Sequence, residues 1–454
     1  MIGVAGGQRQ PDRTLKDYTI GTVNNVTDYR TGRRAVAETA AASGWPSFNS
    51  NNSAMRVDVA LLVSSLFLQR FSLPYGQTFL PIDFVFAALI FVHQFAAGRV
   101  FINYDRLLCF LVMVVATTSS LLLNLTSVTS YGLFVLAYSL FTFSHSSTPD
   151  QYKGTLRSFQ FLVFILSCLA IAQFGAQFAV NGRQLIMFFG IIPGFFYSGQ
   201  WNTIGAIGGS SLLKSNGIFL TEPSTMSQIA AVAIVIEILV FRRPAYLIAL
   251  TLGLLLAYSG TGLSILILAL PFAVFSNRRA QLPALVVSLF ALGLFATGII
   301  QLSAFTSRVG EFGDTQASAF IRFVSPFWMA ADYFSTSSLP ELLLGKGPGY
   351  GFVPAAFYAT SSDTWFKLFI EYGLLGTLVF TIFCVSCFRR SRCPKPVIIG
   401  LVYHYLFTGN HLLNTSLLTI MVVLCTLSGP EPRPARIDRS SQYLPAVIAG
   451  WKAG

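Results

Sequence analysis

Charged residues are scarce in this sequence. Asp, Glu, Lys and Arg make up 11% of the 454 residues, whereas a soluble domain usually carries about 25%. So few charges cannot cover the surface of a soluble globule of this length. The composition therefore excludes a soluble catalytic domain and predicts a chain that lies mostly in lipid, which agrees with the 54% of residues that are apolar.

Cysteine and histidine are also few, and their spacing excludes the common metal and redox sites. The six Cys and four His form no ligand pattern with carboxylates. Cys384 and Cys387 make a CxxC that has neither a second pair for zinc nor the strand–helix–strand surroundings of a redox motif. We therefore expect no metal and no cofactor.

The N-terminal region has no long apolar run before Val57, so it lacks the pattern of a cleavable signal peptide. Residues 1–55 are rich in Gly, Ser, Thr, Asn and Ala, a composition typical of disordered chain. We expect a disordered cytoplasmic tail over 1–55, a transmembrane domain over 56–428 and a cytoplasmic tail over 429–454.

Long apolar runs predict an all-α, polytopic membrane protein with about twelve spans, because a spanning helix needs about 20 mostly apolar residues. Two connections are long, at 181–225 and 305–363. The candidate spans are 57–72, 78–97, 106–125, 127–145, 157–180, 226–241, 246–259, 261–277, 283–304, 364–388, 396–411 and 413–428. The pair 246–259 and 261–277 is also compatible with one re-entrant hairpin.

The distribution of Lys and Arg orients these spans. Twelve spans put both termini on one side, and most of the 30 Lys and Arg fall on that side. Cations collect on the cytoplasmic side of membrane proteins, so we expect cytoplasmic termini and two long extracytoplasmic loops. The net charge of +12 is thereby explained without a nucleic-acid partner.

Seven cations remain for the outer side, where topology disfavours them. Arg and Lys bind phosphate groups, Arg by a planar fork and Lys as a point charge. The outer cations therefore suit an anionic lipid head group or a diphosphate, although solubility of the loops also explains any one of them. They are Arg70, Arg183, Lys214, Arg308, Arg322, Lys346 and Lys367.

Several motifs gather at the predicted outer face. Lys214 precedes a G-x-F-x-x-E-P-S sequence, and Ser259 begins S-G-T-G. Arg308 and Arg322 lie in the second loop, which continues to a G-x-G-x-G turn and an E-x-G-L-L-G helix start. The motif residues are Gly217, Phe219, Glu222, Pro223 and Ser224, then Gly347, Gly349 and Gly351, then Glu371 through Gly376.

In their order and placement these motifs resemble the O-antigen polymerase and O-antigen ligase superfamily, including the Wzy-type polysaccharide polymerases of bacterial membranes. The resemblance covers about 57–428 and implies a GT-C-like fold. It also implies glycosyl transfer from a glycan on a polyprenyl diphosphate, in the bacterial cytoplasmic (inner) membrane. The ligase branch usually carries a His-Asn pair before the E-x-G-L-L-G helix, where this sequence has Ser362-Asp363-Thr364-Trp365.

The resemblance and the residue chemistry together nominate a site. Lys214, Arg308, Arg322 and Arg183 are the candidates for binding the diphosphate. Glu222 and Asp363 are the candidate catalytic groups, although a carboxylate near a helix N-terminus also serves as a cap or a helix-end charge. Gly217, Pro223, Gly347, Gly349 and Glu371 are expected to shape the site, with Glu371 paired to a Lys or Arg.

The preferred interpretation is a polymerase of lipid-linked oligosaccharide repeat units. Expected partners are the lipid-linked substrate, membrane lipids, and a flippase and chain-length regulator of the same pathway. One alternative is a ligase that transfers finished glycan to another acceptor. The alternative from another class is a secondary transporter or flippase, which often shows inverted repeats, and none is visible in this sequence.

The charge asymmetry predicts the side on which each connection lies. Reporter fusions at Gly313 and Ala356 should report an extracytoplasmic location, and fusions at Arg243 and Ser391 a cytoplasmic one. A cytoplasmic signal at Gly313 would contradict the whole arrangement.

Overall fold

The structure is a computed structural model. It describes residues 53–75, 78–123, 127–179, 207, 212–298, 300, 310, 312–315, 317–350 and 363–429. All of these belong to one compact unit, Asn49–Gly454. Residues 1–52 of the predicted tail 1–55, residues 430–454 of the predicted tail 429–454, Arg183 and Arg308 lie outside the described residues.

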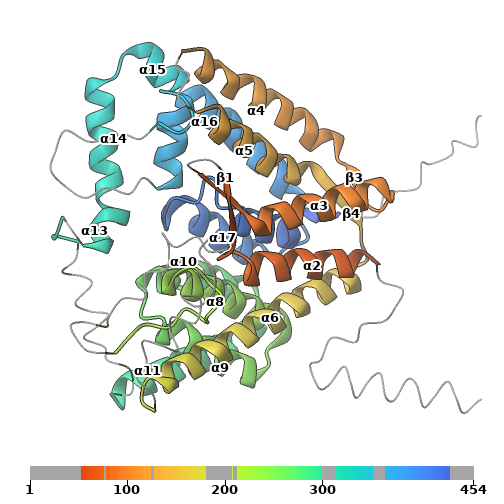
Figure 1. The fold of residues 1–454 in the computed structure, drawn as a ribbon. Helices are drawn as coiled ribbons and strands as arrows, with labels where there is room; N and C mark the ends of the chain where they lie inside the picture. Colours follow the sequence, from red (N-terminus) through yellow and green to blue (C-terminus); the bar gives the residue numbers. More distant parts are fainter. Residues whose placement is uncertain are drawn as a thin grey trace, which may run out of the picture. The chain divides into compact units, whose positions relative to one another are not determined.

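A helix occupies each of the twelve ranges predicted as spans (Figure 1). Within the described residues, five helical stretches are long and apolar enough to cross a membrane: Tyr104–Leu121, Pro149–Ala176, Pro223–Phe241, Arg278–Ala296 and Thr364–Arg389. The other helices are shorter, so twelve crossings stay a prediction. The twelve helices are α2 (Ser53–Phe67), α3 (Ile82–Ala96), α4 (Tyr104–Leu123), α5 (Val128–Ser139), α6 (Pro149–Ala176), α8 (Pro223–Ile236), α9 (Pro244–Leu256), α10 (Gly260–Ser276), α11 (Gln281–Ala296), α16 (Thr364–Arg389), α17 (Lys395–Phe407) and α18 (Thr415–Met421).

Proline starts several of these helices, because its missing N–H and fixed φ suit the first helical position. Pro149, Pro223 and Pro244 begin α6, α8 and α9. At α6 the preceding Thr148 also exchanges hydrogen bonds with Gln151 in a capping box. The helix starts are thus encoded locally.

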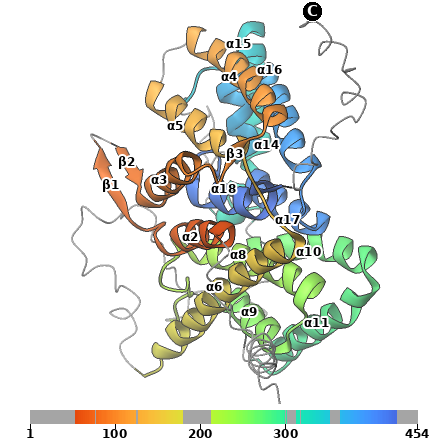
Figure 2. The same ribbon diagram turned by 90° about the vertical axis from the view of Figure 1, so that its right-hand side faces the viewer.

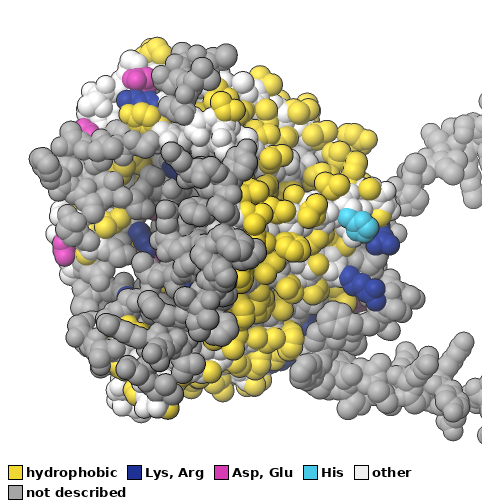
Figure 3. Space-filling view, in the orientation of Figure 1, with side chains coloured by type: hydrophobic (Ala, Val, Ile, Leu, Met, Phe, Trp, Pro, Cys, Tyr) yellow, Lys and Arg dark blue, Asp and Glu magenta, His cyan; other side chains and the backbone are white. Residues whose placement is uncertain are grey.

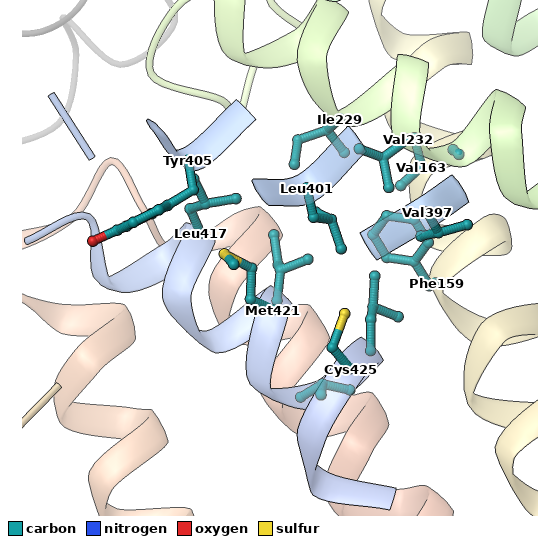
Figure 4. Packing of buried hydrophobic residues seen from close by; sticks show 14 of the residues in the cluster. Phe159, Val163, Ile229, Val232, Val397, Leu401, Tyr405, Leu417, Met421 and Cys425 are labelled. Atoms are coloured by element: carbon teal, nitrogen blue, oxygen red, sulfur yellow. The ribbon is translucent and has the colours of Figure 1, made fainter. Parts of the chain in front are cut away.

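Helix α8 lies at the centre of the helical packing and contacts α6, α9, α10 and α17. Its apolar window is 78% buried, against 17% for the window that contains α11, so α8 faces protein and α11 mainly its surroundings. The buried cluster around it includes Phe159, Val163, Ile229, Val232, Val397, Leu401, Leu417, Met421 and Cys425 (Figure 4).

The turn between α9 and α10 packs directly on α8. Gly262 donates its N–H to Ser227 Oγ over 3.2 Å, and a Cβ on Gly262 would lie 2.4 Å from the Ser227 carbonyl oxygen. The S-G-T-G motif therefore serves as a close helix contact.

The outward-facing sides of several helices are apolar. Exposed large side chains line α3 and α4, among them Phe86, Leu89, Val92, Leu108 and Val115. Hydrophobic side chains cover a broad area of one face (Figure 3). A surface of this kind is what a lipid-embedded helical protein presents.

Short strands replace the ends of some predicted spans. Strands β1 (Ser72–Tyr75) and β2 (Thr78–Pro81) form an antiparallel hairpin beside α2 and α3 (Figure 2). Strand β4 (Phe143–Ser146) pairs with β3 (Phe101–Ile102) and β5 (Ser428–Gly429). Thus the fold is helical with a few strands rather than purely α-helical.

The predicted second loop contains three helices within its described part, α13 (Ser318–Phe323), α14 (Ser325–Thr336) and α15 (Leu339–Leu344). Met329 and Tyr333 of α14 pack on Phe366 and Ile370 of α16. This loop is therefore a folded layer against the first turns of α16.

A break in α16 holds that layer in place. Gly373 has φ +65° and interrupts the helix, so the preceding carbonyl groups are open to other donors. Lys346 donates its N–H to the Ile370 carbonyl over 2.7 Å, and Gly347 to that of Glu371 over 3.1 Å. The G-x-G-x-G turn and the E-x-G-L-L-G helix are thus joined by backbone hydrogen bonds.

The close approach depends on glycine on both sides. Gly345 and Gly373 both have positive φ. A Cβ on Gly345 would lie 2.4 Å from the Glu371 carbonyl oxygen, and one on Gly373 2.4 Å from that of Leu343. Neither position leaves space for a side chain.

Gly373→Ala should lower the midpoint of thermal unfolding and the yield of folded protein. The backbone of Gly373 (φ +65°, ψ −170°) lies in a region essentially limited to glycine, which costs other residues about 1–3 kcal/mol, and the added methyl group meets backbone that cannot move freely. Gly293→Ala in α11 is the matched control, because nothing lies within 4 Å of its Cβ. Equal stability of the two variants would refute this role of Gly373.

Candidate functional site

Arg322 of α13 joins two loops that are far apart in the sequence. Its Nη2 lies 3.4 Å from Glu222 Oε2, and the two side chains are 23% and 26% exposed. Ser224 Oγ donates to the same carboxylate oxygen over 2.6 Å. A partly exposed ion pair of this length contributes at most about 1 kcal/mol to stability. It therefore orients the Arg322 side chain but neutralises its positive charge only weakly.

Asp363 lies directly before α16, within range of the positive charge of Arg322. Its side chain is 2% exposed, and within the described residues its Oδ1 has no hydrogen-bond partner. Burial raises the pKa of Asp363 to about 8, while the positive charge of Arg322 opposes that rise. Burial without a hydrogen-bond donor favours the protonated form of a carboxyl group.

The helix-cap interpretation of Asp363 is wrong. Asp363 occupies the N-cap position of α16, but its side chain makes no capping hydrogen bond. The carboxyl group is held among buried neighbours and does not reach the free N–H groups of the first turn. Glu222 likewise stands at the N-cap of α8 without a capping bond, since its carboxylate is engaged by Ser224 and Arg322.

The connection between α17 and α18 approaches the same place. His411 donates its backbone N–H to Thr364 Oγ1 over 2.7 Å, and Thr364 Oγ1 donates to the Gly409 carbonyl over 3.0 Å. Burial, and to a smaller extent the charge of Arg322, lower the pKa of His411 to about 3. The imidazole is therefore neutral at physiological pH. The sequence interpretation did not include it, since no motif surrounds it.

The end of α2 holds the turn that leads to Glu222. Arg70, which is 2% exposed, donates from Nη1 to the Ile218 carbonyl over 2.6 Å. Ile218 has φ +69°, a strained conformation for a β-branched residue. The sequence marks Arg70 as an outer cation, and the structure gives it this positioning contact.

Other predicted residues of this first loop lie close by. Gly217 is in the same turn, where its Cβ position would be 3.0 Å from the Leu166 carbonyl oxygen. Pro223 is the buried first residue of α8. Lys214 is half-buried. The residue before it, Leu213, donates its N–H to Gln177 Oε1. The residue after it, Ser215, donates its N–H to the Leu256 carbonyl. These contacts place Lys214 near the ends of α6 and α9, and none of them joins it to Arg322.

The remaining predicted residues shape the second loop. Gly347 binds the carbonyl of Glu371 as described above, and the backbone N–H of Gly349 donates to the Glu371 carboxylate. Glu371 Oε1 also lies 3.6 Å from Lys367 Nζ, so the expected pairing of Glu371 with a cation is confirmed. Within the described residues, no three His, Cys, Asp or Glu side chains lie close enough together to hold a metal ion.

The fold and these residues define a helical membrane protein in which one arginine pairs with the carboxylate of Glu222 and acts electrostatically on the buried Asp363 and on His411. The family described as WcaD colanic acid polymerase matches residues 58–345, more than half of the chain. The protein belongs to that family and is a polysaccharide polymerase of the glycosyltransferase type. No curated protein matches the sequence. The family match includes Glu222 and Arg322 and ends before Asp363 and His411.

Proposed function

We propose that the protein joins polyprenyl-diphosphate-linked oligosaccharide repeat units into a surface polysaccharide or exopolysaccharide at the outer face of the bacterial cytoplasmic membrane. The observation that carries this proposal is the ion pair of Arg322 with Glu222, together with the buried Asp363 on which the charge of Arg322 acts. An arginine beside two carboxyl groups combines a cation for a diphosphate with a group that accepts a proton. Family membership favours polymerisation over ligation or transport.

The predicted topology supports an outer-face site. Glu222 precedes α8, Asp363 precedes α16, and His411 lies between α17 and α18. With twelve spans and cytoplasmic termini, all three connections fall on the extracytoplasmic side. Residues that meet in space are thus also predicted to share one side of the membrane.

In the reaction that we propose, a hydroxyl oxygen of the acceptor unit attacks the anomeric carbon of the donor glycan. The new glycosidic bond forms as the bond from that carbon to the diphosphate breaks, and polyprenyl diphosphate leaves. Arg322 binds the diphosphate and stabilises its growing charge. Lys214, Arg308 and Arg183 are further candidates for that contact, so the proposal invokes no metal ion.

The two carboxyl groups have different surroundings and therefore different proposed roles. Glu222 is engaged by Ser224 and Arg322, so we assign it the positioning of the guanidinium. Asp363 has a buried oxygen without a hydrogen-bond partner among the described residues. We therefore propose that it accepts the proton of the acceptor hydroxyl group. A flippase that supplies the repeat units and a chain-length regulator remain the expected partners.

Arg322→Ala should convert long polymer into single repeat units in cells that depend on this protein. Losing one charge-assisted contact to phosphate costs about 1.5–3 kcal/mol, which is tenfold or more in transfer. Arg322→Lys should also be impaired, because an ammonium cannot replace the bidentate fork. The measurement is the length distribution of the glycan on gels, at matched protein levels.

Arg279→Ala is the control, since Arg279 is exposed on the predicted cytoplasmic side. Normal polymer from Arg322→Ala would contradict the proposed site. Accumulation of full-length polymer on the carrier lipid would point to a ligase. Repeat units retained on the cytoplasmic face would point to a transporter.

The initial rate of transfer should rise as the pH increases through about 8 and then level off. Asp363 accepts a proton only when ionised, and its pKa of about 8 leaves it mainly protonated below that pH. Asp363→Asn should lose most activity and this pH dependence, whereas Asp332→Asn in the same loop should keep both. A wild-type rate that is independent of pH between 6.5 and 9 would contradict the assignment of Asp363 as the base.

A further inference from the structure

We propose that the connection between α17 and α18 is a bridge of hydrogen bonds between α8 and α16, the two helices that begin directly after Glu222 and Asp363. Gln228 and Thr364 are the positioning residues at the two ends of this bridge. The inference rests on the proposed function, because it concerns how the proposed base Asp363 is held relative to Glu222. No sequence motif assigns a role to either positioning residue.

Thr364, the first residue of α16, is completely buried and is tied to the connection by three hydrogen bonds. Its backbone N–H and its Oγ1 both donate to the Gly409 carbonyl, over 3.2 and 3.0 Å. The same hydroxyl oxygen accepts the backbone N–H of His411 over 2.7 Å. Because Asp363 directly precedes Thr364, a shift of the Asp363 backbone would strain these bonds.

Gln228, in the second turn of α8, holds the other end of the bridge. Its Nε2 donates to Thr408 Oγ1 over 3.1 Å, and both side chains are almost completely buried. Thr408 directly precedes Gly409, whose carbonyl is the acceptor at α16. Since α8 begins directly after Glu222, only two residues of the connection separate the two carboxyl-bearing helix starts along this path.

Further hydrogen bonds hold the connection itself. Thr408 Oγ1 donates to the His404 carbonyl over 2.7 Å at the end of α17. The Leu412 carbonyl accepts from the Tyr138 hydroxyl of α5 over 3.0 Å. Gly409 has φ +144°, a conformation that glycine adopts without steric cost. The connection is therefore fixed by neighbours on several sides and serves as a spacer of defined length.

The spacing matters because both carboxyl groups serve one reaction. Glu222 orients the guanidinium of Arg322, which binds the leaving diphosphate in the proposed reaction, and Asp363 takes the proton of the attacking hydroxyl group. Attack and departure occur at the same anomeric carbon, so the two helix starts must keep a fixed separation. Misplacing a reacting group by about 1 Å costs up to about a hundredfold in rate.

The test uses the purified full-length protein in detergent, with lipid-linked repeat units extracted from cells that lack it. Thr364→Val keeps the shape of the side chain but removes the hydroxyl group, so kcat should fall about tenfold with little change in KM. Thr364→Ser keeps the hydroxyl group and should retain most of the activity. Thr381→Val is the matched control, because the Thr381 hydroxyl donates to the Thr377 carbonyl one turn earlier in α16, and it should transfer as the wild type does.

Gln228→Met tests the other end of the bridge and decides the question even where Thr364→Val folds poorly. Methionine has a similar length but no N–H donor, so kcat should fall in the same way. If both residues act through one bridge, the double variant should lose little more than the worse single variant. An unchanged kcat in Gln228→Met, or losses that multiply in the double variant, would overturn the bridge.

The outcomes separate this inference from the proposed function. If the wild-type protein makes no polymer from these units, or Asp363→Asn transfers at the wild-type rate, the proposed reaction or its base is wrong and the bridge loses its role. If Asp363→Asn is impaired and Thr364→Val is not, only the bridge is wrong. Equal losses in Thr364→Val and Thr364→Ser would reduce Thr364 to a packing residue.

Discussion

The positive charge of Arg322 organises the candidate site, because it acts on groups of the first loop, of its own loop and of the connection between α17 and α18. Glu222 pairs with it at 3.4 Å, and its field acts on both the Asp363 carboxyl group and the His411 ring. A partly exposed ion pair is weak, which is consistent with the proposed role of the guanidinium in binding an anionic substrate. Without that charge, Asp363 and His411 would be two buried polar groups with no common function.

The place of Arg322 depends in turn on how the second loop is held. No long apolar run fixes α13–α15 in a membrane, and the layer is attached instead through its contact with α16. The break at Gly373 exposes the carbonyls of Ile370 and Glu371, to which Lys346 and Gly347 donate. The close approach leaves no space for a Cβ at Gly345 or at Gly373, which explains why both positions are glycine.

Two residues illustrate what motif order does not reveal. Arg70 stands at the end of an apolar run and resembles any outer cation, yet it holds the turn before Glu222 through the Ile218 carbonyl. His411 lies in a short connection without a motif, and only its contacts with Thr364 and Asn414 relate it to the site. Polar residues used for positioning carry no local pattern, because their partners come from distant parts of the chain.

The sequence by itself determined the helical class and the approximate places of the apolar helices, and it predicted the candidates Glu222, Arg322 and Asp363. Apolar run length is a local property, and the motifs that contain or flank these residues occur in recognisable order. The tertiary structure decided where the candidate residues lie. It pairs Arg322 with Glu222, a hundred residues away, and it places Lys214 near the ends of α6 and α9. It also replaced the expected cap at Asp363 with a buried carboxyl group of raised pKa. Burial and pairing depend on how helices pack against each other, and no local pattern of residues specifies that packing.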